Sequence, residues 1–308
     1  MLTAVIPTRN RPIDLAKAVT SVCAQTRLPD ELIIIDQGLS NESSILVRSL
    51  VQGVVPMQLI YIHDTNISGL VEAKHVAANI SKSDIICFLE DDIVLEPEYF
   101  EEIKKGFDDQ PSMIGCCGII TNVPQYQYGY KFFFNLFHRG IFEDRRLDIY
   151  EKCIGRQNRL IACNTLSGGA SAWRREVFYV IPFDIANGFH MLEDIDFSTR
   201  VAMHYGERLY INTNARLEHY SSPINREVLG PRQRRKLIEY IIYYKKRRNH
   251  NWATLSFLWL LFGLFLEAVV QTASSRSLSV IKGFFSGLRE GFFRKVIHQN
   301  LQSSIHLS

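Results

Sequence analysis

Short apolar runs alternate with longer amphipathic segments through the first third of the chain. Four runs rich in Ile, Val and Leu predict β-strands at Thr3–Thr8, Glu31–Asp36, Gln58–Asp64 and Asp84–Glu90. Segments of helical length and pattern lie between or after them, at Pro12–Gln25, Ser40–Gln52, Gly69–Ser81 and Pro97–Phe107. Strands that alternate with helices predict βαβ units, and therefore an α/β fold with a mostly parallel sheet that binds ligands at the carboxyl ends of its strands.

The pattern is less regular in the middle of the chain. Met113–Thr121 predicts a further strand, Arg208–Thr213 a short one, and a helix is expected to begin at Glu193. The Tyr- and Phe-rich stretch Tyr126–Phe142 fits neither period, which leaves open whether it is a loop that covers a site or part of a binding surface.

The last quarter of the chain differs in character. Trp252–Val270 runs for 19 residues with one charged residue, Glu267, which approaches the roughly 20 apolar residues of a spanning helix. Leu278–Ile297 mixes Phe and Leu with basic residues, and basic clusters lie on both sides of the apolar run, so no orientation across a membrane follows. We expect residues 1–225 to form the α/β domain and residues 226–308 a helical region that lies in or dips into the cytoplasmic leaflet. The alternative is a C-terminal helix packed on the domain itself.

Charge and cysteine content narrow the class of protein. Residues 226–308 carry 14 Lys and Arg against 4 Asp and Glu, whereas residues 1–225 carry 21 against 28, so a basic tail (+10) follows an acidic body (−7). Such a tail fits an anionic membrane surface better than nucleic acid, because its basic residues surround an apolar run and form no recognition motif. The six cysteines contain no C-x-x-C pair, which predicts reduced core thiols, a cytosolic setting and no zinc site, and the N-terminus does not read as a secretory signal.

Three of the predicted strands end in polar residues that should share one edge of the sheet. These ends are Thr8–Arg9, Asp36–Gln37 and Glu90–Asp92. Adjacent carboxylates repel and are costly to bury unpaired, so a positive partner is expected beside Glu90–Asp92. Such acids supply the oxygen ligands that Mg²⁺ or Mn²⁺ prefers, although a solvated turn would also account for the triplet.

Five segments occur in the order and approximate spacing of a known family. They read AVIPTRNRP, IIIDQG, SDIICFLEDDIVLEP, SGGASAWRREVF and FHMLEDIDFSTRV. From about residue 2 to 220 the chain resembles the family 2 glycosyltransferases. The resemblance implies a GT-A fold, a nucleoside diphosphate sugar as donor, a divalent metal ion, and transfer of the sugar with inversion at the anomeric carbon.

The resemblance also implies roles for individual residues. Thr8, Arg9 and Asp36 would hold the base and ribose, and Gln37 stands where the family usually has a second aspartate. Lys74 would face the diphosphate, in place of the usual Arg-Asn pair. Asp92 would contact the metal with Glu90 beside it, Asp91 would lie near the donor sugar or ribose, and His219 near the metal or diphosphate. Gly168 and Gly169 permit close backbone approach, and Gly169 and the following Ala170–Trp173 would line the donor-sugar or acceptor pocket. Trp173 offers a stacking surface for a sugar, although core packing is the more common use of tryptophan.

The motif LEDIDF supplies candidates for a general base. An acceptor hydroxyl must lose a proton as it attacks, and a carboxylate can take that proton. On a helix Glu193 and Asp196 share a face while Asp194 projects about 100° away, so the three cannot all serve one site. The resemblance places the base on Asp194, with Glu193 orienting the acceptor or Asp194.

These expectations combine into one leading hypothesis and two alternatives. The leading one is an inverting transferase at the cytoplasmic face of a membrane, acting on a lipid-linked or polysaccharide acceptor, with bacterial surface-polysaccharide synthesis as its setting. The alternatives are a metal-dependent hydrolase of nucleotide sugars or sugar phosphates, and a non-catalytic membrane-bound recognition module on the same scaffold.

Overall fold

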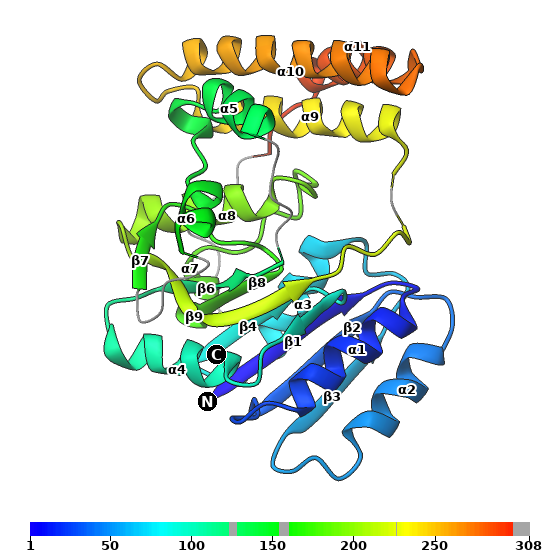
Figure 1. Cartoon of the computed structure of the whole chain (residues 1–308), viewed down its shortest axis with the longest axis vertical. Helices are drawn as coiled ribbons and strands as arrows, with labels where there is room; N and C mark the ends of the chain where they lie inside the picture. Colours follow the sequence, from blue (N-terminus) through cyan, green and yellow to red (C-terminus); the bar gives the residue numbers. More distant parts are fainter. Residues whose placement is uncertain (123–127, 154–159, 226, 298–308) are drawn as a thin grey trace.

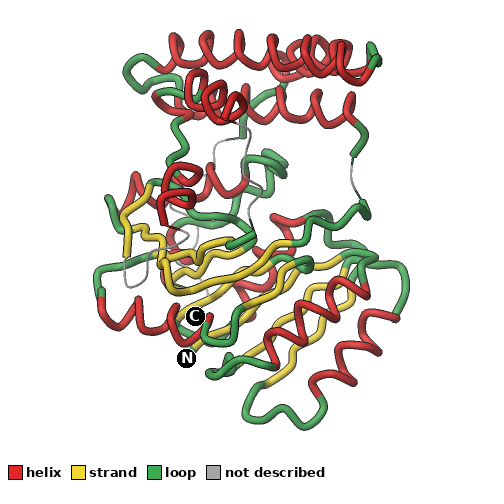
Figure 2. Tube along the Cα trace, in the orientation of Figure 1, coloured by secondary structure: helices red, strands yellow, loops and turns green. Residues whose placement is uncertain are grey.

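The structure is a computed structural model and describes residues 1–122, 128–153, 160–225 and 227–297. An α/β body forms one end of the molecule and a layer of helices the other (Figure 1). The tube view separates them clearly, with the strands gathered in the body and long helices crossing above it (Figure 2). The chain contributes to the helical layer twice, at residues 128–142 and again from residue 229 onward (Figure 1).

The first four strands form a parallel half-sheet. They are β1 (Leu2–Thr8), β2 (Glu31–Asp36), β3 (Gln58–His63) and β4 (Ile85–Leu89), in the order β3-β2-β1-β4. The register pairs Thr8 with Asp36, so the polar ends of β1 and β2 lie side by side at one edge. This confirms the prediction that the ends of these strands open together.

The sheet continues beyond β4 with mixed strand directions. The remaining strands are β5 (Ile93–Leu95), β6 (Gly115–Ile120), β7 (Leu160–Cys163), β8 (Ala170–Arg174) and β9 (Leu209–His219). β8 is antiparallel to β4 and β6, and β9 is parallel to β6 but antiparallel to β5 and β7. The predicted strand Arg208–Thr213 therefore continues to His219, which brings the end of β9 next to the residues that follow β4.

Alternate side chains of the parallel strands enter two separate cores, as strand geometry requires. Leu2, Ala4 and Ile6 pack on one face with α1 (Pro12–Cys23), α2 (Glu42–Val51) and α4 (Tyr99–Asp109). Val5 packs on the other face with α3 (Leu70–Ile80), α6 (Arg146–Cys153), α7 (Glu176–Val180) and α8 (Glu193–Tyr205). Both faces are covered, so the strands read as continuous apolar runs.

The helical layer has a core of its own. It contains α5 (Tyr128–Phe137), the short helix η1 (Gly140–Phe142), α9 (Leu229–Arg247), α10 (Ala253–Ser275) and α11 (Ser279–Phe293). Phe142, Phe189 and Leu192 join residues of α9–α11 in one cluster, so this layer packs on the α/β body. Gly283 and Gly287 let α11 approach α9 closely, because a Cβ at either would lie 2.2–2.4 Å from a backbone oxygen of α9.

The layer bears on the membrane prediction. By length and composition, α10 is the one helix among the described residues that could cross a membrane, and 33% of its most apolar window is buried inside the protein. Leu255, Leu258 and Phe262 on α10 are at least half exposed. The helix thus packs on the other helices of the layer along one side and presents apolar side chains on the other. Membrane association, its alternative of packing on the domain, and the domain division at residue 225 stay predictions.

Candidate active site

Three metal-binding side chains converge where β4 ends. Oxygen atoms of Glu90 and Asp92 and a ring nitrogen of His219 all lie within 4.8 Å of one another. The sheet register explains the convergence, because Ile93 pairs with His219 across the antiparallel β5–β9 ladder. His219 Nε2 lies 3.1 Å from Glu90 Oε2 and 3.1 Å from Asp92 Oδ1. The acidic triplet predicted Glu90 and Asp92 as metal ligands, the family resemblance implied His219 near the metal or diphosphate, and the fold brings the three to one point.

The charges of this cluster fit a divalent cation. Hydrogen bonds to Asp92 and Glu90 raise the pKa of His219 to about 10, because the two acids favour the positively charged form of the ring. Burial would raise the pKa of Asp92, but His219 and the backbone N–H of Ser222, 2.8 Å from Oδ2, hold it below its usual value. Two carboxylates and an imidazole can coordinate Mn²⁺, and the carboxylate oxygens can coordinate Mg²⁺. Metal binding would release the His219 proton.

A positive side chain, Arg11, also lies beside the acids, where the sequence had led us to expect a metal ion as the positive partner. Its guanidinium donates to Asp91 Oδ1 at 2.9 Å and lies 3.7 Å from Asp92 Oδ2. Thr8 Oγ1 donates to Asp91 Oδ2 at 2.7 Å, which ties the ends of β1 and β4 together. Burial raises the pKa of Asp91 to about 6, against the opposing effects of Arg11 and Thr8. Arg9, predicted to hold the nucleotide, is exposed two residues earlier.

Asp36 and Gln37 shape the neighbouring turn. Asp36 is fully buried and accepts from Gly38 N (2.8 Å) and Tyr61 Oη (2.6 Å). Gln37 Oε1 accepts from the backbone N–H of Gly69, whose φ of +88° suits glycine, at the start of α3. Both side chains thus position the loops of the edge, and their predicted contacts with base and ribose stay predictions.

Lys74 contacts Glu193 in this structure. The side chain is 2% exposed, and Nζ donates to Glu193 Oε1 at 2.6 Å and to Gly168 O at 2.8 Å. Burial raises the pKa of Glu193, while the Lys74 ammonium opposes that rise. The prediction of Lys74 as a phosphate ligand therefore needs correction: a lysine held inside the protein by a carboxylate and a carbonyl is a positioning group for Glu193 and Gly168.

Asp194 lies beside a second buried network. Its Oδ2 is bonded to an Arg146 guanidinium nitrogen and lies 3.4 Å from the N–H of Gly168. Arg146 also donates to Asp144, with Nη2 2.7 Å from Oδ2, and to Leu166 O at 3.2 Å. Asp194 and Glu193 thus flank Gly168 from two directions, each held by its own cation. Asp196 points elsewhere, to Lys246 and Arg200, so the three acids do not serve one site, but the expected grouping was wrong: Glu193 and Asp194 meet at Gly168, and Asp196 is the acid that lies apart.

The two glycines lie against acids of the site, whereas Trp173 is a core residue. A Cβ on Gly168 would lie 2.1 Å from Glu193 Oε1, and one on Gly169 2.4 Å from Glu90 Cδ, so a side chain at either position would displace one of these acids. Trp173 is 2% exposed and packs edge-on against Phe197 with ring centroids 4.9 Å apart. The prediction that Trp173 stacks on a sugar is wrong for this structure, because its ring faces are covered by the core.

Two arginines of the site were not predicted. Arg11 lies in the same motif as Arg9, and the expected positive partner of Glu90–Asp92 was the signal that could have found it. Arg146 follows the aromatic stretch that had no clear pattern, and nothing in its local sequence distinguishes it from a surface residue.

Comparisons with known proteins agree with this geometry. A profile of glycosyl transferase family 2 matches residues 3–181, more than half of the 308 residues. An uncharacterized glycosyltransferase of Haemophilus influenzae is 29% identical over 113 residues, which are 37% of this chain and 36% of that protein. The match therefore spans about a third of that curated relative.

Solved structures show the fold. The mannosyltransferase PcManGT from Pyrobaculum calidifontis, solved with GDP-Man and Mn²⁺, has a TM-score of 0.60 at 13% identity, over 95% of this chain and 87% of that one. S. aureus TarS 1–349 with UDP-GlcNAc has a TM-score of 0.57 at 12% identity, over 94% and 80%. The architecture is a GT-A-like α/β fold. The chain belongs to glycosyl transferase family 2.

Proposed function

We propose that this protein is a metal-dependent inverting glycosyltransferase that moves a sugar from a nucleoside diphosphate sugar to a hydroxyl of a lipid-linked or saccharide acceptor. The observation that carries the proposal is the convergence of Glu90, Asp92 and His219 at the carboxyl edge of the sheet. Family membership supports transfer from a nucleotide sugar. GDP-Man and UDP-GlcNAc, found in two structures of similar fold, are the first donors to test.

The proposed chemistry needs a base and a fixed acceptor. Asp194 would take the proton of the attacking hydroxyl on a carboxylate oxygen, as a general base does. Arg146 and the Gly168 N–H orient that carboxylate, while Lys74 holds Glu193 on the other side of the same glycine. Because each acid has its own fixed partner, Glu193 and Asp194 can take separate roles in positioning and proton transfer.

A divalent ion completes the proposed donor site. Glu90, Asp92 and His219 would hold Mg²⁺ or Mn²⁺, which supplies positive charge for the diphosphate leaving group. Arg11 adds a fixed positive charge next to Asp91 and Asp92. Thr8 and Asp91 would then lie on the donor side of the edge, and Arg9 and Gln37 nearest the nucleotide's base.

The proposed location is the cytoplasmic face of a membrane. The apolar side chains that α10 exposes, together with the basic residues of α9 and α11, fit a helical layer that rests on an anionic leaflet. A surface-polysaccharide pathway would supply acceptors at that face.

The metal and donor assignment is tested by ligand-dependent thermal stability. Purified full-length protein is titrated with UDP, GDP and a panel of nucleotide sugars, with and without Mn²⁺. We expect one nucleotide series to raise the melting temperature only when Mn²⁺ is present, and Asp92→Asn to abolish that shift because a metal ligand is lost. Asp108→Asn, the same change at an exposed acid on α4, is the matched control.

The reaction class is tested on the same preparations. Release of nucleoside diphosphate is followed over time with and without an added acceptor lipid extract. Release that depends on acceptor supports transfer, whereas equal release without it would identify the hydrolase. Nucleotide binding with no release of nucleoside diphosphate under either condition would favour the non-catalytic recognition module and overturn the proposed activity.

A further inference from the structure

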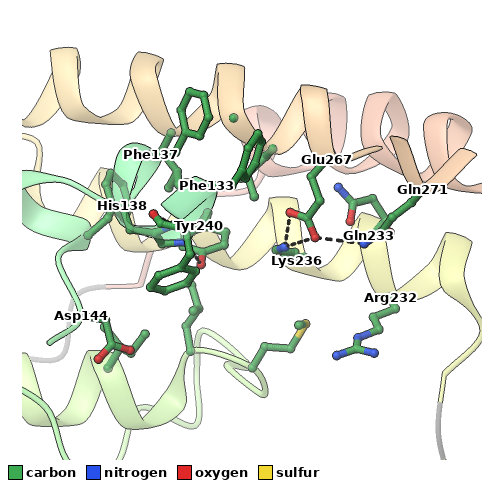
Figure 3. A pocket seen from close by; sticks show the side chains of 18 of the residues that line it. Phe133, Phe137, His138, Asp144, Arg232, Gln233, Lys236, Tyr240, Glu267 and Gln271 are labelled. Carbon is green, nitrogen blue, oxygen red and sulfur yellow. Dashed lines mark hydrogen bonds and ion pairs between the residues drawn. The ribbon is translucent and has the colours of Figure 1, made fainter. Parts of the chain in front are cut away.

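A cavity of about 680 Å³ lies between the helical layer and the α/β body. Its wall comes from α5, α9, α10 and the segment that leads into α8 (Figure 3). Most of the wall is apolar, with Phe133, Phe137 and Phe142 gathered toward α5. Burial lowers the pKa of His138 there to about 4, so this part of the wall is uncharged at neutral pH. This volume is typical of a site that encloses a sizeable ligand.

The opposite part of the wall is basic and contains an unsatisfied donor. Gln233 is 3% exposed, yet its Nε2 has no hydrogen-bond partner among the described residues. Arg232 is exposed at the start of α9, and no ion pair to it is found in the described ranges. Lys236 lies one turn further on and is held by Glu267 Oε2 at 2.6 Å. Figure 3 shows Arg232 and Gln233 at one end of the cavity and Phe133 and Phe137 toward the other.

The cavity reaches the residues around Asp194. Leu192 and Ile195, which flank the acids at the start of α8, line it, and so does Arg146, which is bonded to Asp194. It also reaches the outer surface, because Val270 lines it and is 63% exposed on α10. One space therefore runs from the exposed apolar side of α10 to residues next to the proposed base.

We propose that this cavity binds the lipid-phosphate portion of the acceptor: a single hydrocarbon chain against the aromatic wall and a phosphate on Arg232 and Gln233. This deepens the proposed function and rests on it, since a saccharide carried on that phosphate would present the acceptor hydroxyl to Asp194. A phosphate would give Arg232 the anion it lacks and Gln233 Nε2 the acceptor it lacks. A wall this apolar favours a hydrocarbon chain over a bare saccharide, whose hydroxyls would be left without partners.

Two variants and one control separate the parts of the site. Arg232→Glu replaces the proposed phosphate contact with a repelling charge. Gly129→Trp adds a large side chain at a residue of α5 that lines the cavity, and the fold is not strained because the added Cβ meets no atom within 4 Å. Arg248→Glu makes the same charge change at the exposed far end of α9, outside the cavity wall.

The probe is decyl monophosphate at submicellar concentration, titrated by calorimetry into the full chain in phosphatidylcholine nanodiscs, with empty nanodiscs as the blank. We expect one site per chain, at least tenfold weaker binding in Arg232→Glu, loss of binding in Gly129→Trp, and a change of less than twofold in Arg248→Glu. Inorganic phosphate and 1-decanol should each bind at least tenfold more weakly than decyl phosphate. Thermal unfolding of each variant checks that it is folded.

Several results would overturn the proposal. Equal affinity for inorganic phosphate would mean an anion site without a lipid chain, and equal affinity for 1-decanol an apolar site without a phosphate contact. Unchanged binding in both Arg232→Glu and Gly129→Trp would mean adsorption elsewhere. Mn²⁺-dependent binding of UDP or GDP, measured on the same samples, reports separately on the donor site, so failure of the transferase proposal and failure of the lipid site are distinguishable.

Discussion

Two clusters of three acids, one at the end of β4 and one at the start of α8, are neutralised to very different extents. In the β4 cluster, Arg11 pairs with Asp91 and Asp92, and His219, which is charged only when protonated, pairs with Glu90 and Asp92. On α8 each acid pairs with a permanent cation: Lys74 for Glu193, Arg146 for Asp194, and Lys246 with Arg200 for Asp196. Arg146 is shared with Asp144, and Lys246 with Asp184.

The difference separates a ligand site from a framework. The β4 cluster keeps an excess of negative charge that an external cation would balance, whereas the α8 cluster is complete within the protein. Buried ion pairs hold side chains in place but contribute little net stability while intact, and they are costly to break. We therefore expect variants of β4 to lose ligand binding, and variants of α8 to lose geometry or stability while the donor still binds.

The largest expected effect is that of Asp194→Asn. Loss of the general base should lower kcat by about 10²–10⁴-fold, while nucleotide binding with Mn²⁺ is retained because Glu90, Asp92 and His219 are untouched. Steady-state kinetics and nucleotide titration on the same protein measure the two quantities, with Asp108→Asn as the matched exposed control. Normal turnover by Asp194→Asn would remove Asp194 from the base role.

The comparison also shows how far the sequence predicts this molecule. The parallel strands could be predicted from the sequence because both faces of the half-sheet are covered, so each strand is a largely continuous apolar run. The β4 acids were recoverable because adjacent residues at a strand end share an edge. Lys74, in contrast, was misassigned because its partner Glu193 is 119 residues away along the chain, and only the folded structure shows that the two side chains are in contact.

The cavity could not be predicted for the same physical reason. Its wall is assembled from α5, α9, α10 and the segment before α8, each of which contributes a few ordinary Phe, Leu or basic residues. No local sequence pattern distinguishes the residues that line the cavity. Trp173, which was predicted to offer a stacking surface for a sugar, packs in the core instead. Local motifs identify chemistry that adjacent residues supply, but not a space that distant helices enclose.

Asp196→Asn should have the next largest effect, on stability. Asp196 is 1% exposed and contacts Lys246, Arg200 and Arg247. Removing the carboxylate leaves these cations without their shared partner, which should lower the free energy of unfolding by about 3–5 kcal/mol. Urea unfolding followed by circular dichroism measures this. A loss below about 1 kcal/mol would show that the α8 framework does not depend on that ion pair.

The change in stability that pH causes through Asp196 should be smaller than the change caused by Asp196→Asn. Burial alone would raise the pKa of Asp196, but Arg200, Lys246 and Arg247 outweigh it and lower the pKa from 3.8 to about 2. A lowered folded-state pKa gives stability that is present above about pH 4 and lost as the pH falls toward 2. Its size is about 2 kcal/mol.

This pH effect is measured as a difference between two proteins. The gap in unfolding free energy between wild type and Asp196→Asn should be constant from about pH 5 to 6 and narrow by about 2 kcal/mol on acidification to pH 2, because a protonated aspartate no longer attracts the three cations. A gap that stays constant across this range would mean that Asp196 titrates alike in the folded and unfolded chain.

The smallest effect is expected at an ion pair with the same spacing but little burial. Lys104 and Asp108 on α4 are four residues apart, as are Asp196 and Arg200, but the Asp108 side chain is 60% exposed whereas that of Asp196 is 1% exposed. Water and salt screen the exposed pair, so Lys104→Ala should change the free energy of unfolding by less than about 0.5 kcal/mol. Urea unfolding at low and high salt tests this against Asp196→Asn. If both variants lost similar stability, sequence spacing and not burial would set the strength of these pairs, and the contrast between a completed framework on α8 and an open ligand site on β4 would lose its physical basis.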